Sequence, residues 1–220
     1  TASGDITTTD ISTDGQMITI NSSTGNILAD NAVFITLSST AENSGSIQLI
    51  APQGSIRAGI LSTAANNLGI NGNAGDVTLT ALGDIDVSSI DTFSSAFAPT
   101  GDAIAGDGGN VSIETSGKIT VDNIDTSSFA ASTEANPSNT VQSGSGGDVT
   151  LSAGEDITVE LGIATNAGLF CDTCTFAGLD ETANGRGGTI SITSESGVIQ
   201  IDSLFSAAIR AGGEITVSGQ

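Results

Sequence analysis

Acidic side chains recur at matching positions of this sequence, and they are its best candidates for metal binding. Carboxylates that lie one strand apart repel one another unless they share a cation, and Ca²⁺ prefers such oxygen ligands. Asp and Asn also favour turns, and acidic rows are typical of solvated faces, so both interpretations stay open. The candidate calcium ligands are Asp122, Glu160, Asp202, Asp76 and Asp148.

The two cysteines lie close together, in the segment Cys171-Asp172-Thr173-Cys174. Structural zinc usually needs four Cys or His ligands, and the sequence has no histidine. A redox motif is expected beside a βαβ pattern, which this sequence lacks. We expect Cys171 and Cys174 to form a small disulfide, with free thiols or a catalytic or metal-binding role as alternatives. A structural disulfide implies an oxidising compartment.

Residues suited to catalysis are scarce. The sequence has no His and no Tyr, and its four basic residues are scattered. A lyase acting on acidic polymers needs clustered basic residues, whereas a hydrolase needs only two carboxylates roughly 5–9.5 Å apart. Many acidic pairs meet that condition by chance. We therefore expect no enzymatic activity, no catalytic residue and no cofactor, with calcium as the alternative.

One phrase recurs through the chain and predicts its architecture. Gly-Asp-Val-Thr-Leu begins at Gly75 and again at Gly147, and related phrases begin at Gly109 and Gly188. Apolar and polar residues alternate inside each phrase, which is the period of a β-strand. Such repetition is typical of solenoids, whose coils bury their apolar faces by stacking. We predict an all-β parallel β-helix of six to seven coils, in a single domain spanning 1–220.

Two apolar columns set the register of the coils. The first column is Ile18, Ile47, Val77, Val111, Val149, Ile190 and Ile215. The second is Ile27, Ile56, Ile85, Ile119, Ile157 and Ile199, each eight or nine residues after its partner. Variation in length follows a threonine column at Thr63, Thr92, Thr126 and Thr165. A third side of the coil therefore accepts insertions, at approximately 93–107, 127–145 and 166–186.

Half-coils are expected at 1–13 and 212–220. Their apolar residues Ile6, Ile215 and Val217 match the columns of the complete coils. A bare terminal coil leaves a strand edge unpaired, which invites pairing with another strand. The sequence is then a stretch of a longer β-helix, or a subunit whose half-coils complete one another head to tail. The expected partners are neighbouring coils of a longer chain or other copies of the protein.

The charge balance excludes some partners. There are 25 acidic residues against four basic ones, for a net charge of −21. Nucleic-acid binders need a basic patch, so nucleic acid is not an expected partner. No run of about 18 apolar residues is present, which argues against membrane insertion. Scarce Lys and Arg leave few tryptic sites, which is consistent with an extracellular protein.

Two further groups of side chains have a structural and a functional interpretation. Outward Thr and Ser residues on the first strand resemble the flat faces of ice-binding β-helices, although Gln48, Ile50 and Glu114 interrupt them. Strand propensity alone also explains them. All seven phenylalanines are expected on the third side, where they form a second core or an apolar surface for a partner.

The phrase at residues 146–159, Gly-Gly-Asp-Val-Thr-Leu-Ser-Ala-Gly-Glu-Asp-Ile-Thr-Val, resembles the repeats of filamentous-haemagglutinin-like exoproteins of cyanobacterial and Gram-negative type. The resemblance implies a right-handed parallel β-helix and export through an outer-membrane partner. It also implies adhesion to surface glycans or to host or cell receptors, without catalytic residues. We expect a secreted or cell-surface, structural or adhesive segment. A filament subunit is the alternative, and an ice-binding or carbohydrate-binding module is the third.

Overall fold

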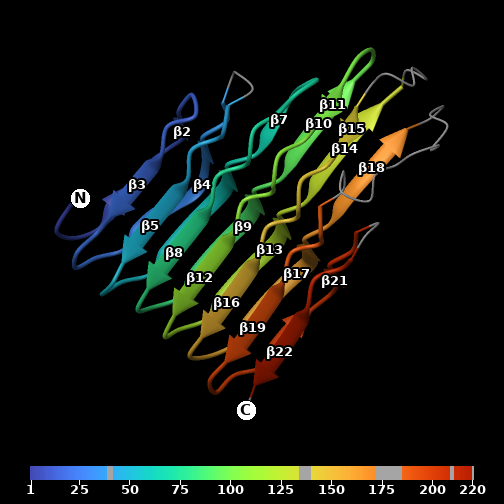
Figure 1. Cartoon of the computed structure of the whole chain (residues 1–220). Coiled ribbons are helices and arrows are strands. Elements are labelled where there is room, and N and C mark those ends of the chain that lie inside the picture. The colour runs from blue at the N-terminus through green and yellow to red at the C-terminus, as the bar shows by residue number, and fades with distance from the viewer. Residues whose placement is uncertain (39–41, 134–139, 172–184, 209–210, 220) are drawn as a thin grey trace.

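The protein is a parallel β-helix, as its repeats predict (Figure 1). The computed structural model describes residues 1–38, 42–133, 140–171, 185–208 and 211–219. Within these ranges every element is a strand, and strands of successive coils pair in parallel. The described residues form no helix that is long and apolar enough to cross a membrane.

The first sheet has seven strands and follows the first apolar column. Its register aligns Val77, Val111, Val149, Ile190 and Ile215 on neighbouring strands, as expected from the repeats. Inward residues are buried and outward ones partly exposed, which is the alternation read from the sequence. In order of stacking, the strands are β3 (Ile18–Asn21), β5 (Ile47–Ala51), β8 (Val77–Ala81), β12 (Val111–Thr115), β16 (Val149–Ala153), β19 (Ile190–Ser194) and β22 (Ile215–Gly219).

The second sheet follows the second column and carries the chain to the threonine column. Its register shifts where β4 has extra residues between Ala29 and Val33, and where β17 has one extra residue between Val159 and Gly162. Such irregularities bend a strand locally. The strands are β1 (Ile6–Thr7), β4 (Ile27–Ile35), β6 (Ile56–Ser62), β9 (Ile85–Asp91), β13 (Ile119–Asp125), β17 (Ile157–Ala164) and β20 (Ile199–Ile201), with β2 (Ile11–Ser12) paired to β4 and β21 (Leu204–Phe205) paired to β17.

Branched aliphatic side chains fill the space between these two sheets, here called the main core. Val111, Ile113, Ile119 and Leu151 are each at most 1% exposed. Close packing of this kind leaves little room for water or for a change in volume. The columns of like residues therefore hold each coil at one width.

Phe34 also lies in the main core, so the expectation that all phenylalanines lie on the third side is wrong. Its strand β4 is nine residues long, and Phe34 stands between Ile11 and Leu61 in the stacked register. At that inward position it is fully buried. Phe205 is likewise in the second sheet, paired with Ala164, but is 57% exposed.

Threonines close the main core of each coil at a feature that we call the waist. The hydroxyl of Thr126 donates to the carbonyl oxygen of Gly147 at 2.7 Å, and the N–H of Gly147 donates back to the carbonyl of Thr126 at 2.8 Å. The same reciprocal pair recurs in five coils, and all five threonines are fully buried. The pairs are Thr36–Gly45, Thr63–Gly75, Thr92–Gly109, Thr126–Gly147 and Thr165–Gly188.

Glycine is required on the other side of the waist. A Cβ on Gly109 would lie 1.9 Å from the carbonyl oxygen of Gly75, and one on Gly147 would lie 2.1 Å from that of Gly109. No side chain fits at either distance, because the backbones of successive coils meet there. The glycine that opens each repeat phrase is thus a packing requirement of the stack.

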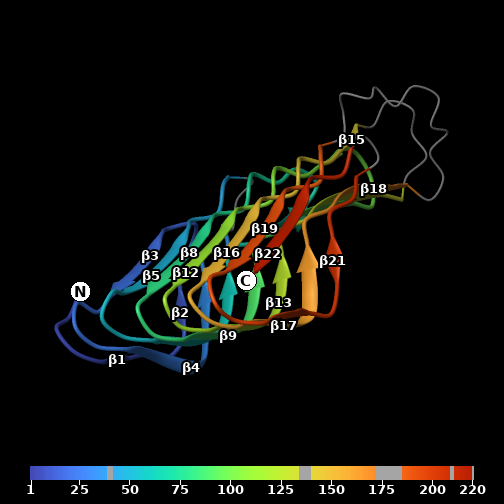
Figure 2. The same cartoon turned by 90° about the horizontal axis from the view of Figure 1, so that it is seen from below.

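The described residues between the waist partners form a third side, here called the side lobe (residues 37–38, 42–44, 64–74, 93–108, 127–133, 140–146, 166–171 and 185–187). Figure 2 shows the part with β15 and β18 extending away from the first two sheets. The sequence separation of the waist partners grows along the rod from 9 to 12, 17, 21 and 23 residues. Most of the length variation therefore falls on this side, as the sequence indicates, and the second sheet varies only by the extra residues at its two register shifts.

Much of the side lobe is regular, although the sequence presents it as insertions. Its strands stack in register, and a second core of small residues lies beneath them, made of Ala96, Ala98, Ala103, Ala105 and Ala130. No phenylalanine whose side chain is described belongs to this core, and Phe97 and Phe129 are 42% and 41% exposed. The strands are β7 (Ala65–Leu68), β10 (Ser94–Ala98), β14 (Ser128–Ser132) and β18 (Ala167–Cys171), with the pair β11 (Ala103–Ile104) and β15 (Val141–Gln142).

Candidate functional site

Two of the candidate calcium ligands lie in a ladder at the corner before the first sheet. Asp76 Oδ1 accepts the main-chain N–H of Asn110 at 2.8 Å, and Asn110 Oδ1 accepts that of Asp148 at 2.8 Å. Asp148 Oδ1 then accepts the N–H of Thr189 at 2.7 Å. Each side chain thus ties its own coil to the next one. A neutral Asn in the middle shows that the ladder needs an acceptor oxygen and not a charge.

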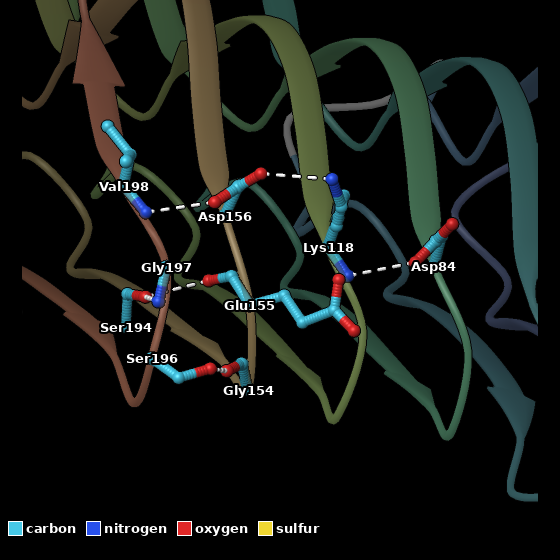
Figure 3. A network of polar contacts seen from close by, with 9 residues as sticks. All are labelled: Asp84, Lys118, Gly154, Glu155, Asp156, Ser194, Ser196, Gly197 and Val198. Atoms are coloured by element: carbon cyan, nitrogen blue, oxygen red, sulfur yellow. Dashed lines mark hydrogen bonds and ion pairs between the residues drawn. The ribbon is translucent and has the colours of Figure 1, made fainter.

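The opposite corner, between the first and second sheets, repeats this arrangement (Figure 3). Asp84 Oδ1 accepts the N–H of Lys118 at 3.0 Å, and Asp156 Oδ1 accepts that of Val198 at 2.9 Å. The Lys118 Nζ lies 2.9 Å from Asp156 Oδ2 and joins the two ties. The Val198 N–H and then the lysine lower the pKa of Asp156, while the bond to Asp156 raises the pKa of Lys118.

The other three candidate ligands lie along the second sheet, where Glu160 and Asp202 are exposed and Asp122 is partly exposed. Asp122, Glu160 and Asp202 each follow a residue of one inward column, Val121, Val159 and Ile201. Glu160 and Asp202 border a shallow hollow on this face. In the described part of the chain, no group of three or more His, Cys, Asp or Glu is close enough to hold a metal ion. Calcium binding stays a prediction.

Outward hydroxyls stack across the first sheet. Thr78, Ser112, Thr150, Ser191 and Thr216 are register partners on successive strands, and Gln48 interrupts the row next to Thr78. The parallel row beside them contains Ile50 and Glu114, the other two interruptions noted in the sequence. Neighbouring strands lie about 4.8 Å apart, so the face presents a regular array of small polar groups.

The predicted assembly residues lie on the outermost coils. Ile215 and Val217 of β22 continue the inward columns of Ile190 and Ile192, and they are 43% and 48% exposed. Ile6 of β1 pairs with Ile27 and is half-buried. The end of the described stack at β22 therefore presents apolar side chains and an unpaired strand edge together.

The predicted disulfide lies outside the described residues. Cys171 is the last residue of β18, and Cys174 falls in the stretch 172–184, which the structure does not describe. The pairing of Cys171 with Cys174 therefore stays a prediction.

Two features were missed by sequence reasoning. The sequence shows the threonine column and the glycine column, but not that they bond to each other across the coil. A groove at the outer junction of the second sheet and the side lobe was also missed, because its residues come from two coils. No protein-family model, curated protein or solved structure matches the chain.

Proposed function

We propose that the chain is a non-enzymatic, extracellular structural or adhesive segment of β-helix. The observation that carries this proposal is that the polar groups of the corners and of the waist bind the protein's own main chain. Corner carboxylates and amides bind the main chain of the next coil, and buried threonines close each coil. These groups build a stack rather than a reaction centre. Such a stack offers long, regular faces on which a surface partner binds.

Composition supports the same proposal. The net charge of −21 favours solubility and disfavours anionic partners such as nucleic acid. Surface glycans and cell receptors are the proposed partners, and the resemblance of residues 146–159 to haemagglutinin-like repeats is consistent with this role. Secretion or surface display is the proposed location.

Cell binding by the isolated chain tests this proposal. Beads that carry the purified protein are expected to bind bacterial or epithelial cells under flow, and beads that carry the unfolded variant Leu151→Asp are not. Turnover of a panel of polysaccharides is measured in parallel and is expected to be zero. Measurable turnover that depends on the folded chain, or equal binding by both proteins, contradicts the proposal.

A head-to-tail filament subunit is the second candidate, favoured by the exposed Ile215 and Val217. Addition of a strand to the open edge of β22 would supply main-chain hydrogen bonds, and the apolar columns would continue across the joint. Heterologous contacts of this kind do not close, so they grow as filaments.

Electron microscopy and native mass spectrometry decide between monomer and filament. Val217→Asp is expected to abolish filaments while the rod stays folded, and removal of residues 212–220 has the same effect. Thr216→Asp adds the same charge to the outward face of the same strand and is the matched control. A protein that stays monomeric at high concentration, with or without these changes, excludes the filament.

The stacked hydroxyls of the first sheet favour ice binding as a third candidate. Thr78, Ser112 and Thr150 stand in register, one coil apart. Thermal hysteresis that disappears in Thr150→Lys but remains in Thr120→Lys, on the second sheet, supports this function. A protein without thermal hysteresis has no ice-binding face.

A further inference from the structure

A groove of about 230 Å³ lies on the outside of the rod, where the second sheet turns into the side lobe. Its walls come from two neighbouring coils, one with β9 and β10 and the other with β13 and β14. The lining residues are Phe93, Ser94, Ser95, Asp125, Ser127 and Phe129. Aromatic rings, hydroxyls and a carboxylate therefore meet in one place on a surface that is poor in aromatic residues.

The two aromatic residues are fixed by the strand register. Ser95 pairs with Phe129 and Ser94 pairs with Ser128, so Phe93 and Phe129 stand diagonally on one outward face. Phe129 lies against the next coil, where a Cβ on Gly168 would be 3.5 Å from its Cδ2. Bare backbone thus supports this ring, which remains 41% exposed. A supported, partly exposed ring is a suitable platform for an apolar surface of a ligand.

The carboxylate of Asp125 is held in position at the groove. Its Oδ1 accepts the main-chain N–H of Ser127 at 2.9 Å. Asp91 is its register partner on the neighbouring strand, about 4.8 Å away along the rod. Asp91 Oδ1 accepts the hydroxyl of Ser89 at 3.1 Å. Asp91 and Asp125 are both only partly exposed, so this corner is partly shielded from water. This burial, and to a smaller degree the charge of Asp125, raises the pKa of Asp91, while the bond from Ser89 opposes the shift.

We propose that this groove binds a neutral pyranose of a surface glycan. One face of a pyranose carries C–H groups that pack on an aromatic ring, while its rim carries hydroxyls. Asp125 accepts hydrogen bonds from those hydroxyls, and Ser95 and Ser127 both donate and accept. A few convergent polar groups beside apolar walls are the general composition of a small-molecule site. This inference rests on the proposed adhesive function, for which it names the ligand class and the binding site.

Charge excludes acidic sugars from the groove. Asp125 and its neighbour Asp91 would repel a uronic or sialic acid, and the net charge of −21 repels an anionic polymer at longer range. A divalent cation is the other chemistry that paired carboxylates attract. The described residues offer no third His, Cys, Asp or Glu ligand beside this pair.

Glycan binding by the folded protein tests the groove. Neutral mannan, galactan and β-1,3-glucan are titrated by calorimetry, with polygalacturonate as the charged comparison and with calcium or EDTA in parallel. Binding of a neutral polymer is expected, and Phe129→Ala is expected to weaken it about tenfold. Asp125→Asn is expected to weaken it less, because the amide keeps one acceptor oxygen. The exposed Leu68→Ala, on the same sheet outside the groove, is the matched control.

Chemical-shift mapping of backbone amides supplies the second readout. The neutral polymer is expected to shift Ser95, Ser127 and Phe129 and to leave β3 and β5 unchanged. If Phe129→Ala and Leu68→Ala bind the neutral polymer equally well, the groove is not the binding site, although the proposed adhesive function still holds. Preference for polygalacturonate, or binding that EDTA abolishes, overturns the neutral-sugar assignment. Cell adhesion without binding of any of the neutral polymers also overturns it.

Discussion

The main core and the side lobe belong to the same coils but are built from different residues. In the main core, Ile, Leu and Val columns meet between two sheets and are almost completely buried. In the side lobe, alanines fill the interior, and hydroxyls tie strands to the opposite backbone. Ser94 donates to the carbonyl of Gly72 at 3.1 Å, and Ser128 to that of Gly106 at 2.8 Å. One compartment is held by packing and the other largely by hydrogen bonds.

This difference explains why the side lobe varies in length much more than the two sheets around the main core. A column of branched aliphatic residues has a fixed width, so an extra residue must bulge out of the ladder, as in β4, or it leaves a void or a clash. Alanine columns and hydroxyl ties impose no such width. The waist separates the two compartments, and the lobe grows from coil to coil without disturbing the main core.

The side lobe also contains the unsatisfied polar atoms of the described structure. Asn71 Oδ1 and Ser143 Oγ are buried without a hydrogen-bond partner there. Ile70, Ile104 and Gln142 are register partners on successive coils. The residues that follow them, Asn71, Ala105 and Ser143, therefore lie in one column. Buried polar atoms are generally costly, so the lobe is expected to be less stable than the main core.

The largest effect is expected from a charge in the main core. Leu151→Asp removes a fully buried side chain and leaves an unpaired carboxylate in a dry interior. Truncation of a buried Leu alone costs about 2–5 kcal/mol, and the buried charge adds several more. Thr150→Asp, one residue away on the outward face, is expected to change the free energy of unfolding by about 0.5 kcal/mol or less. Urea denaturation compares the two, and equal losses would show that the assignment of inward and outward residues is wrong.

A smaller loss of stability is expected from a substitution at the waist. Thr126→Val keeps the shape of the side chain but removes its hydrogen bond to the carbonyl of Gly147. An unsatisfied buried carbonyl costs about 1–3 kcal/mol. Hydrogen exchange is expected to accelerate in Ser128–Ser132 of the lobe more than in Ile119–Asp125 of the second sheet. Thr120→Val, on an outward position of that sheet, is the control, and uniform acceleration in both segments would contradict a separating role for the waist.

The sequence predicts the main core well because two independent signals coincide there. Alternation marks the strands, and branched aliphatics at equal offsets mark the register, so the ladder from Ile18 to Ile215 is confirmed residue by residue. The lobe lacks both signals. Its strand Ser128–Ser132 reads Ser-Phe-Ala-Ala-Ser, and Ala is a poor strand former. The stacked third sheet therefore could not be read from propensity.

The predicted calcium sites stay a prediction, and the groove was not predicted, for a different reason. The recurrence of Asp76 and Asp148 at one offset predicts calcium ligands, but a residue that ties one coil to the next recurs at the same offset. Spacing alone does not separate these two roles. The groove joins Phe93 to Phe129 and Asp125 of the following coil, and it depends on an outward turn at the waist that the sequence does not show.

Corner ties give the next prediction. Asp148→Ala removes the acceptor of the Thr189 N–H and is expected to destabilise the rod by about 1 kcal/mol. Asp148→Asn keeps the oxygen, as Asn110 does naturally in the preceding coil, and is expected to be nearly neutral. Thermal unfolding with and without calcium compares the variants. If Asp148→Asn lowers the Tm as much as Asp148→Ala does, and does so only when calcium is present, then Asp148 is a metal ligand.

The smallest effect, and the only stabilising one, is expected at the junction of the two compartments. Burial raises the pKa of Asp91, the Ser89 hydroxyl opposes this, and the charge of Asp125 adds to it. A raised pKa means that folding favours the protonated form, so this stability is present at low pH and is lost as the pH rises through the folded-state pKa. Asn does not ionise, so Asp91→Asn does not lose stability as the pH rises. The variant is expected to have a slightly higher Tm than the parent protein at neutral pH.

The pH dependence of this gain distinguishes electrostatics from packing. Below the ordinary pKa of 3.8, Asp91 is protonated in both states, so the variant and the parent protein are expected to unfold at the same temperature. Asp125→Asn removes only the neighbouring charge and is expected to give a smaller gain with the same direction of pH dependence. A Tm difference that is constant from pH 3 to pH 8 would mean that the amide improves packing. A loss at neutral pH would mean that the ionised carboxylate, bonded to Ser89, stabilises the junction between the second sheet and the side lobe.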